Sequence, residues 1–177
     1  VTKICISHWH GDHILGLPGL LLTIASMELS KSVYIYGPRG SKHSFQALFG
    51  GIEFEAKFNI NITEVHEGKF FEDDDFALES MPMKHPVPCV GFSFVEKDRR
   101  RIKVDYVKKL GIPEGPLLGK LQRGDDVEFK GKKVSADDAT TLIKGRKIVF
   151  MTDTLPNDNC QKLAANADIL IIDSTYS

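Results

Sequence analysis

The chain has 177 residues, of which 42% are hydrophobic and 27% charged, and its formal net charge is −1. This composition supplies the core of a globular protein and excludes disordered, collagen-like and disulfide-scaffold classes. No apolar run reaches the roughly 18 residues of a membrane span, and three widely spaced cysteines (Cys5, Cys89 and Cys160) favour a reducing cytoplasm.

Strand and helix patterns intermix along most of the chain. Apolar runs predict strands over 1–7, 32–36, 59–65, 76–84 and 90–95. Spaced leucines predict a helix from about 15 to 28, and a shorter helix over 42–49 ends at a Gly-Gly pair. The order predicts an α/β (α+β) fold. Because 1–7 already has the pattern of a core strand, we expect a chain truncated at both ends.

Residues 97–145 differ from their surroundings. They are basic and rich in glycine, with one short helix predicted over 104–110 and stopped by the prolines of IPEGP at 112–116. Strand 147–151, helix 160–167 and strand 168–172 then follow. The pattern predicts a core made of 1–96 and 146–177, interrupted by an insertion at 97–145.

Charge is distributed unevenly along the chain. Residues 95–147 contain 15 Lys and Arg against 9 Asp and Glu, whereas the rest contains 8 against 15. A basic segment in a nearly neutral protein suggests a polyanionic partner. Charge alone favours the alternative, a solvated surface with scattered lysines and arginines.

The strongest chemical pattern is the hexapeptide that follows the first strand. His8, His10, Asp12 and His13 place three imidazoles and a carboxylate within six residues, in a polar loop that leads into a helix. Imidazole suits zinc, and carboxylate oxygen can share such a site. Two histidines at i and i+2 can face one metal from an extended loop, and Asp12 with His13 can face a second. The motif predicts a metal centre.

Further candidate ligands follow other strands. His85 comes after the strand ALESMPMK, and Asp153 comes after KIVFM through Thr152. Loops at strand ends commonly carry functional residues. Either residue alone would be unremarkable, but two metals need more ligands than the hexapeptide provides. Asp173, after ILII, has the same placement with weaker support.

His8-x-His10-x-Asp12-His13 is characteristic of the metallo-β-lactamase superfamily, which the chain resembles. Within it, the chain resembles the ribonuclease Z family of transfer RNA 3′-processing endonucleases. The resemblance extends through SHWHGDHILGLPGLL, through His85 with GFSF at 91–94, through GIPEGPLLGKL at 111–121, and through FMTDT and IDSTY. It implies an αββα sandwich carrying an inserted flexible arm, and removal of 3′ trailers from precursor tRNA to leave a 3′-hydroxyl.

The resemblance also implies a ligand set for two zinc ions per subunit, although the same ligands accept manganese or iron. His8, His10 and His85 would hold one ion, Asp12 and His13 the other, and Asp153 would bridge them. Two metals would hold an attacking hydroxide. Asp12 would also take the proton of the attacking water, and Asp173, where the family usually has Glu, would orient a histidine. An upstream glycine-rich strand and two later histidines of the family are missing.

The implied partner is RNA rather than DNA or a membrane, and the implied assembly is a cytoplasmic homodimer with the apolar 15–25 helix as a candidate interface. The inserted arm would hold the tRNA body by phosphate contacts and shape. Its candidate RNA-binding residues are Arg99, Arg100, Arg101, Lys103, Lys108, Lys109, Gly115, Pro116 and Lys120. His43 and His66 have no partner motif and are predicted to lie on the surface.

Two alternatives stay open on sequence alone. The chain could belong to a superfamily hydrolase of a small ester, thioester or phosphodiester, but such an enzyme has no need of the arm. It could also bind nucleic acid without catalysis, but a decayed enzyme would be expected to lose ligands first. The exact cleavage position, the effect of a terminal CCA and the physiological metal do not follow from the sequence.

Overall fold

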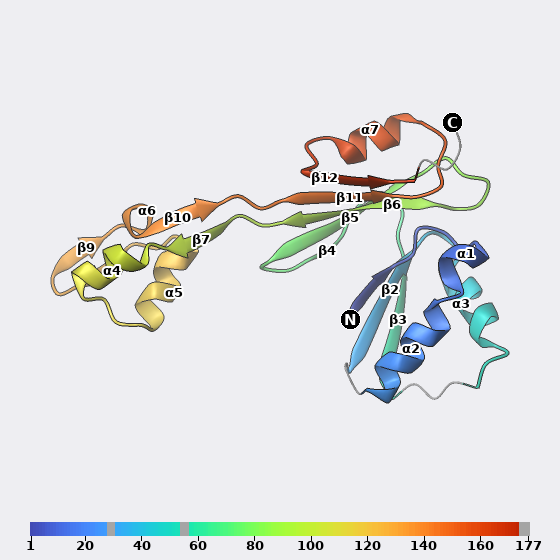
Figure 1. The fold of residues 1–177 in the computed structure, drawn as a ribbon, viewed down its shortest axis with the longest axis horizontal. Helices are drawn as coiled ribbons and strands as arrows, with labels where there is room; N and C mark the ends of the chain where they lie inside the picture. Colours follow the sequence, from blue (N-terminus) through green and yellow to red (C-terminus); the bar gives the residue numbers. More distant parts are fainter. Residues whose placement is uncertain (28–30, 54–56, 174–177) are drawn as a thin grey trace. The chain divides into compact units, whose positions relative to one another are not determined.

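The computed structural model describes residues 1–27, 31–53 and 57–173 (Figure 1). It divides into two compact units, Val1–Val95 together with Lys147–Ser177, and Glu96–Arg146. We call these the core unit and the inserted unit. The inserted unit extends one residue beyond the predicted insertion at each end. No helix among the described residues is long and apolar enough to cross a membrane.

The first sheet of the core unit is parallel. Its strand order is β1-β2-β3, with β1 at Lys3–Cys5, β2 at Ser32–Gly37 and β3 at Asn59–Glu64. Helices α2 (Leu17–Ser26) and α3 (Ser41–Phe49) cover one face. Successive strand residues point to opposite faces, so Val33 and Ile35 both reach the helical side, where they are fully buried.

The second sheet has the order β12-β11-β6-β5-β4. Its strands are β4 (Gly68–Glu72), β5 (Phe76–Pro82), β6 (Val90–Glu96), β11 (Lys147–Met151) and β12 (Ile169–Ile172). Helix α7 (Asp158–Ala164) packs on it through Leu163. Gly91 of β6 permits this close approach, because a Cβ there would lie 2.8 Å from Leu163 and 2.7 Å from Met83.

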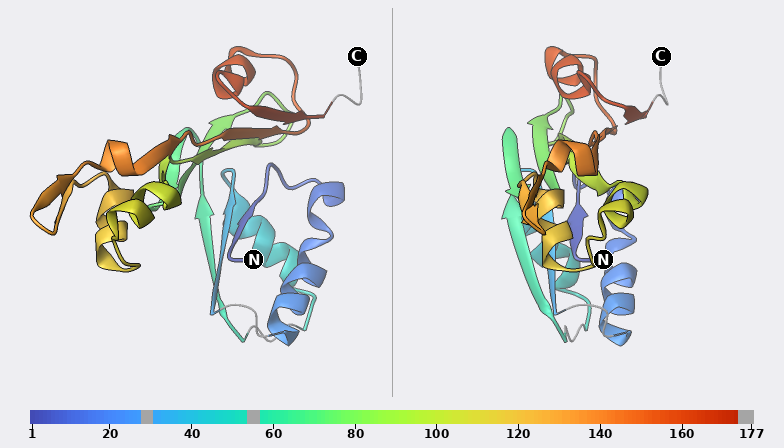
Figure 2. Two further views of the ribbon diagram at one scale, coloured as in Figure 1. Left: turned by 60° about the vertical axis from the view of Figure 1, so that its left-hand side comes forward. Right: turned by 90° about the vertical axis from the view of Figure 1, so that its left-hand side faces the viewer.

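The opposite faces of the two sheets meet in a small aromatic cluster. Tyr36 of β2 and Val65 after β3 pack there with Val90 and Phe92 of β6, and Phe70 of β4 lies against them. With α2 and α3 outside one sheet and α7 outside the other, the core unit has the predicted helix–sheet–sheet–helix order (Figure 2). The α/β prediction is therefore confirmed.

The inserted unit is folded around its own core. Strands β7 (Arg99–Ile102) and β10 (Thr140–Ile143) pair antiparallel, and β8 (Val127–Phe129) forms a hairpin with β9 (Lys132–Val134). The helices are α4 (Val104–Leu110), α5 (Pro116–Arg123) and α6 (Ala136–Ala139). The buried residues of this core are Val107, Ile112, Leu121, Val127, Val134, Ala136 and Ala139.

The sequence patterns miss most of this unit. IPEGP does follow the end of α4, where Gly111 adopts a left-handed conformation with φ of 71°. However, Pro116 is also the first residue of α5. Proline is tolerated there because backbone N–H groups in the first turn of a helix have no intrahelical acceptor, so the absence of one costs no hydrogen bond. The patterns also miss β4 and the single turn α1 (Gly11–Ile14), which are too short for a clear period.

Candidate metal centre

The hexapeptide lies at the carboxyl end of β1. Two backbone hydrogen bonds hold the chain just before it: Ile6 N–H donates to the Tyr36 carbonyl at 2.7 Å, and Val90 N–H donates to the Ser7 carbonyl at 2.9 Å. These bonds connect the segment to both sheets. His8 is fully buried as a result, and His10 lies at the start of α1.

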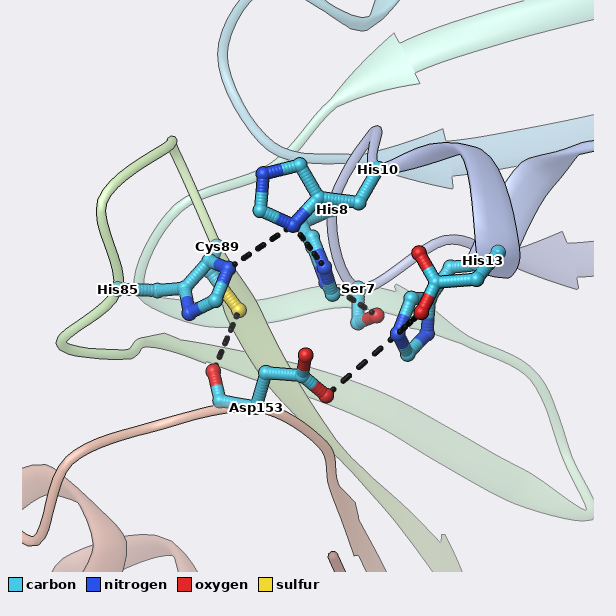
Figure 3. Close-up of polar contacts among 8 residues, drawn as sticks. Ser7, His8, His10, His13, His85, Cys89 and Asp153 are labelled. Carbon is cyan, nitrogen blue, oxygen red and sulfur yellow. Dashed lines mark hydrogen bonds and ion pairs between the residues drawn. The ribbon is translucent and has the colours of Figure 1, made fainter. Parts of the chain in front are cut away.

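His85 and Asp153 reach the same place from the second sheet. The segments that carry them are joined where Lys84 pairs with Leu155, whose N–H donates to the Lys84 carbonyl at 2.9 Å. One ligand atom from each of His8, His10, His85 and Asp153 lies within 4.8 Å of the others. Figure 3 shows these side chains converging. The structure therefore gathers four predicted ligands from three segments far apart in sequence.

His13 lies beside both His8, with ring centroids 4.2 Å apart, and Asp153, and Asp12 lies next to His13. His13 Nε2 is 3.5 Å from Asp153 Oδ1 (Figure 3). It is 3.4 Å from Asp12 Oδ2. Asp153 thus adjoins both the three-histidine group and His13. The Asp12 side chain is 77% exposed, so it stands at the solvent side of the centre.

Asp173 directly follows β12, and it is exposed. Its backbone N–H donates to the Met151 carbonyl at 3.1 Å. Ser174, Thr175 and Tyr176 of the IDSTY segment lie outside the described residues.

The electrostatics of the cluster suit a cation. Burial, together with the nearby imidazoles of His13, His85 and His10, lowers the pKa of His8 to about 4. His8 is therefore neutral at pH 7 and keeps a lone pair for coordination. Asp153 Oδ1 is buried, and beyond its ion-pair contact with His13 it has no hydrogen-bond partner among the described residues. Imidazole nitrogens beside one such carboxylate form a donor set that fits a divalent ion.

Two contacts that the sequence reasoning missed hold the hexapeptide in place. Ser7 Oγ lies 3.1 Å from His8 Nδ1, which leaves Nε2 to face the cluster. Trp9 Nε1 donates to Ser41 Oγ at 2.7 Å, and that hydroxyl donates to the Pro38 carbonyl at 2.6 Å. Ser7 was visible as the neighbour of His8, whereas no local pattern connects Trp9 with Ser41.

Replacing Ser7 with alanine should weaken metal binding about 10- to 100-fold, the usual cost of losing a partner that orients a ligand. Ser7→Thr keeps the hydroxyl and should retain most of the affinity. Zinc titration of the metal-free protein measures both variants. Equal affinity of Ser7→Ala and the unmodified protein would show that the hydroxyl does not orient His8.

The candidate RNA-binding residues all lie in the inserted unit, with different environments. Arg100 is half-buried, and its Nη1 lies 2.6 Å from Asp137 Oδ1. Lys103 donates to the Asp137 carbonyl at 3.3 Å. Gly115 caps α5 with φ of 141°, and Pro116 is the first residue of the helix. Exposed cations that form no ion pair with another described residue are Arg99, Arg101, Lys108, Lys109 and Lys120.

Comparisons with known proteins show which family the chain belongs to. Residues 1–172 match the family model of the metallo-beta-lactamase superfamily. The chain is 40% identical to a ribonuclease Z of Leuconostoc mesenteroides over 181 residues, which cover 99% of this chain and 57% of that protein. It is 33% identical to ribonuclease Z of Bacillus subtilis over 180 residues, which cover 100% and 59%.

A solved structure gives the same indication. The crystal structure of human tRNase Z, short form, matches 96% of this chain and 56% of its own chain, with a TM-score of 0.58 and 26% identity. The chain therefore spans under three-fifths of the length of these relatives. It belongs to the metallo-β-lactamase superfamily, and the resemblance of its sequence to the ribonucleases Z is confirmed.

Proposed function

We propose that this chain forms part of a zinc-dependent endoribonuclease that removes 3′ trailers from precursor tRNA. Water adds to the phosphorus, the bond from phosphorus to the 3′ oxygen breaks, and that oxygen takes a proton. The tRNA keeps a 3′-hydroxyl and the trailer keeps the phosphate. The supporting observation is that a His/Asp cluster and a folded basic insertion occur together in a chain 40% identical to a ribonuclease Z.

His8, His10 and His85 would hold one ion, Asp12 and His13 would contribute to a second, and Asp153 would bridge the two. The distance of 3.5 Å between Asp153 Oδ1 and His13 Nε2 supports the bridging role. Divalent ions supply Lewis-acid neutralisation of the phosphate and hydroxide near neutral pH. Asp12 stands exposed beside His13, where its carboxylate can accept the proton of the attacking water. For Asp173 we propose an orienting role.

The inserted unit would hold the tRNA body. Arg99 and Arg101 alternate with Arg100 along β7, so they share a face opposite the arginine that contacts Asp137. Together with Lys108, Lys109 and Lys120 they offer exposed cations to phosphates, which position RNA without reading its sequence.

We further propose a cytoplasmic homodimer. Helix α2 buries Leu17, Leu21 and Ile24 in the core but exposes other apolar side chains. The exposed residues around it are Leu15, Leu20, Leu22 and Met27. Such a surface supports contact with a second copy. The three cysteines are unpaired, which accords with a reducing compartment.

A metal-dependent hydrolase of small esters or phosphodiesters is the second candidate, because the metal centre alone would serve it equally well. To distinguish the two candidates, precursor tRNA carrying a 3′ trailer is treated with the zinc-loaded complete gene product, and the position of the cut is mapped. We expect a cut at the base of the acceptor stem that leaves a 3′-hydroxyl. Hydrolysis of a small phosphodiester without that cut would favour the second candidate.

A further inference from the structure

A pocket of about 310 Å³ lies beside His85 in the core unit. It is built where strands of both sheets end or begin. Pro38 and Arg39 follow β2, Val65 and His66 follow β3, and other lining residues come from the segment 83–89, which connects β5 to β6. Because β1, β2 and β3 are parallel, their carboxyl ends lie at one edge, which also carries His8 and His10 after β1. The pocket therefore adjoins the candidate metal centre.

The lining of the pocket is apolar with a cationic rim. Val65, Met83 and Val87 supply aliphatic surface, and Pro82, Pro86 and Pro88 add flat rings. Arg39 is exposed at the rim, and none of the described lining residues is acidic. This chemistry suits a flat ring that carries an adjacent negative charge, which is the chemistry of a nucleotide.

The size of the pocket indicates one nucleotide rather than a duplex. Its volume is near the lower end of the roughly 300–1,000 Å³ of small-molecule sites. Single-stranded RNA is commonly recognised base by base, with each base stacked on an aromatic ring or on an arginine guanidinium plane. Arg39 and His66 provide both kinds of plane.

His85 connects the pocket to the reaction. It contributes a ligand atom to the metal cluster and also lines the pocket. A nucleotide bound in the pocket would therefore contact a residue that also belongs to the cluster.

We propose that the pocket takes the base of one unpaired nucleotide directly next to the cleaved bond, with Arg39 contacting that base or its phosphate. The proposal rests on the proposed ribonuclease function and identifies which part of the RNA this edge of the core unit recognises. The nucleotide can belong to the mature tRNA end or to the trailer, and the test below distinguishes them.

The test combines Arg39→Ala with RNA that lacks one base. Precursor tRNAs carry an abasic nucleotide on one side or the other of the cleaved bond. We expect Arg39→Ala to lower kcat/KM about tenfold, the effect of one lost base-stacking contact. One of the two abasic RNAs should show a similar loss of kcat/KM with the unmodified protein. On that RNA, Arg39→Ala should cause little further loss, because the effects of removing two groups that contact each other do not add. The affected position identifies the nucleotide.

Lys31→Ala is the matched control, because it removes a charge from the opposite end of β2 and does not line the pocket. It should leave kcat/KM unchanged, and zinc content should be the same in all three proteins. The proposal would be overturned by unchanged kcat/KM for Arg39→Ala. It would also be overturned if Arg39→Ala lowered kcat/KM by the same factor on both abasic RNAs as on intact RNA.

A binding measurement separates this proposal from the proposed function. Short single-stranded RNA oligonucleotides, intact or with one abasic position, are titrated into zinc-loaded Asp12→Ala protein, in which cleavage is slow. The pocket predicts weaker binding of an abasic oligonucleotide and the same weakening for Arg39→Ala. Absence of both effects contradicts the pocket assignment even if tRNA is cut, and their presence without tRNA cleavage contradicts only the proposed function.

Discussion

Replacing Asp153 with alanine should reduce hydrolysis of every substrate by at least about 100-fold. This exceeds the effect of removing a residue that only hydrogen-bonds to a metal ligand, which is about 10- to 100-fold. The Asp153 carboxylate lies in the cluster with His8, His10 and His85, and it also contacts His13. Its loss removes the negative charge that the cluster offers to divalent ions. Both precursor tRNA and a small phosphodiester should be affected equally, because the substitution acts at the reacting centre.

Two further readouts make this prediction specific. Zinc bound per chain should fall, and added zinc should raise the thermal midpoint of the unmodified protein but raise that of Asp153→Ala much less, since a ligand stabilises only the state that binds it. Asp158→Ala, an exposed carboxylate in the first turn of α7, is the control and should retain both zinc and activity. Full activity with normal zinc content in Asp153→Ala would contradict the assignment.

Removing the inserted unit should abolish tRNA cleavage, with a loss of at least about 100-fold, and spare hydrolysis of a small phosphodiester. Several phosphate contacts would be lost together, and affinities that depend on phosphate contacts fall steeply as contacts are removed. The metal cluster lies entirely in the core unit, so its chemistry should persist.

The structure shows where to make this deletion. Val95 and Lys147 are paired residues of the antiparallel strands β6 and β11. An Asn-Gly turn can therefore replace 96–146, because two-residue hairpin turns accept that dipeptide well. A matched control keeps the unit and replaces Lys108 and Lys109 with glutamate, which should weaken tRNA cleavage in a salt-dependent way. Equal loss of both activities in the deletion would contradict the division of labour.

Much of the core unit could be predicted from the sequence. Strands β2, β3, β6 and β11 and helices α2, α3 and α7 coincide with the predicted elements to within a few residues. Their apolar patterns are clear, because each packs apolar side chains into one of the clusters of the core unit. β4 was missed because its five residues offer only a short pattern, and β7 because RRRI has no apolar face and depends on pairing with β10.

The sequence alone determined which residues could bind metal, because the hexapeptide concentrates three imidazoles and a carboxylate, and because His85 and Asp153 follow strands. It also determined the position of the basic insertion through its charge. Only the tertiary structure decided that His85 meets His10 and that Asp153 lies next to His13, since strand pairing and packing bring residues tens of positions apart within 3.5 Å. The Trp9–Ser41 contact, the separate core of the inserted unit and the pocket at Arg39 are decided in the same way, because they arise from the arrangement of elements rather than from any local period.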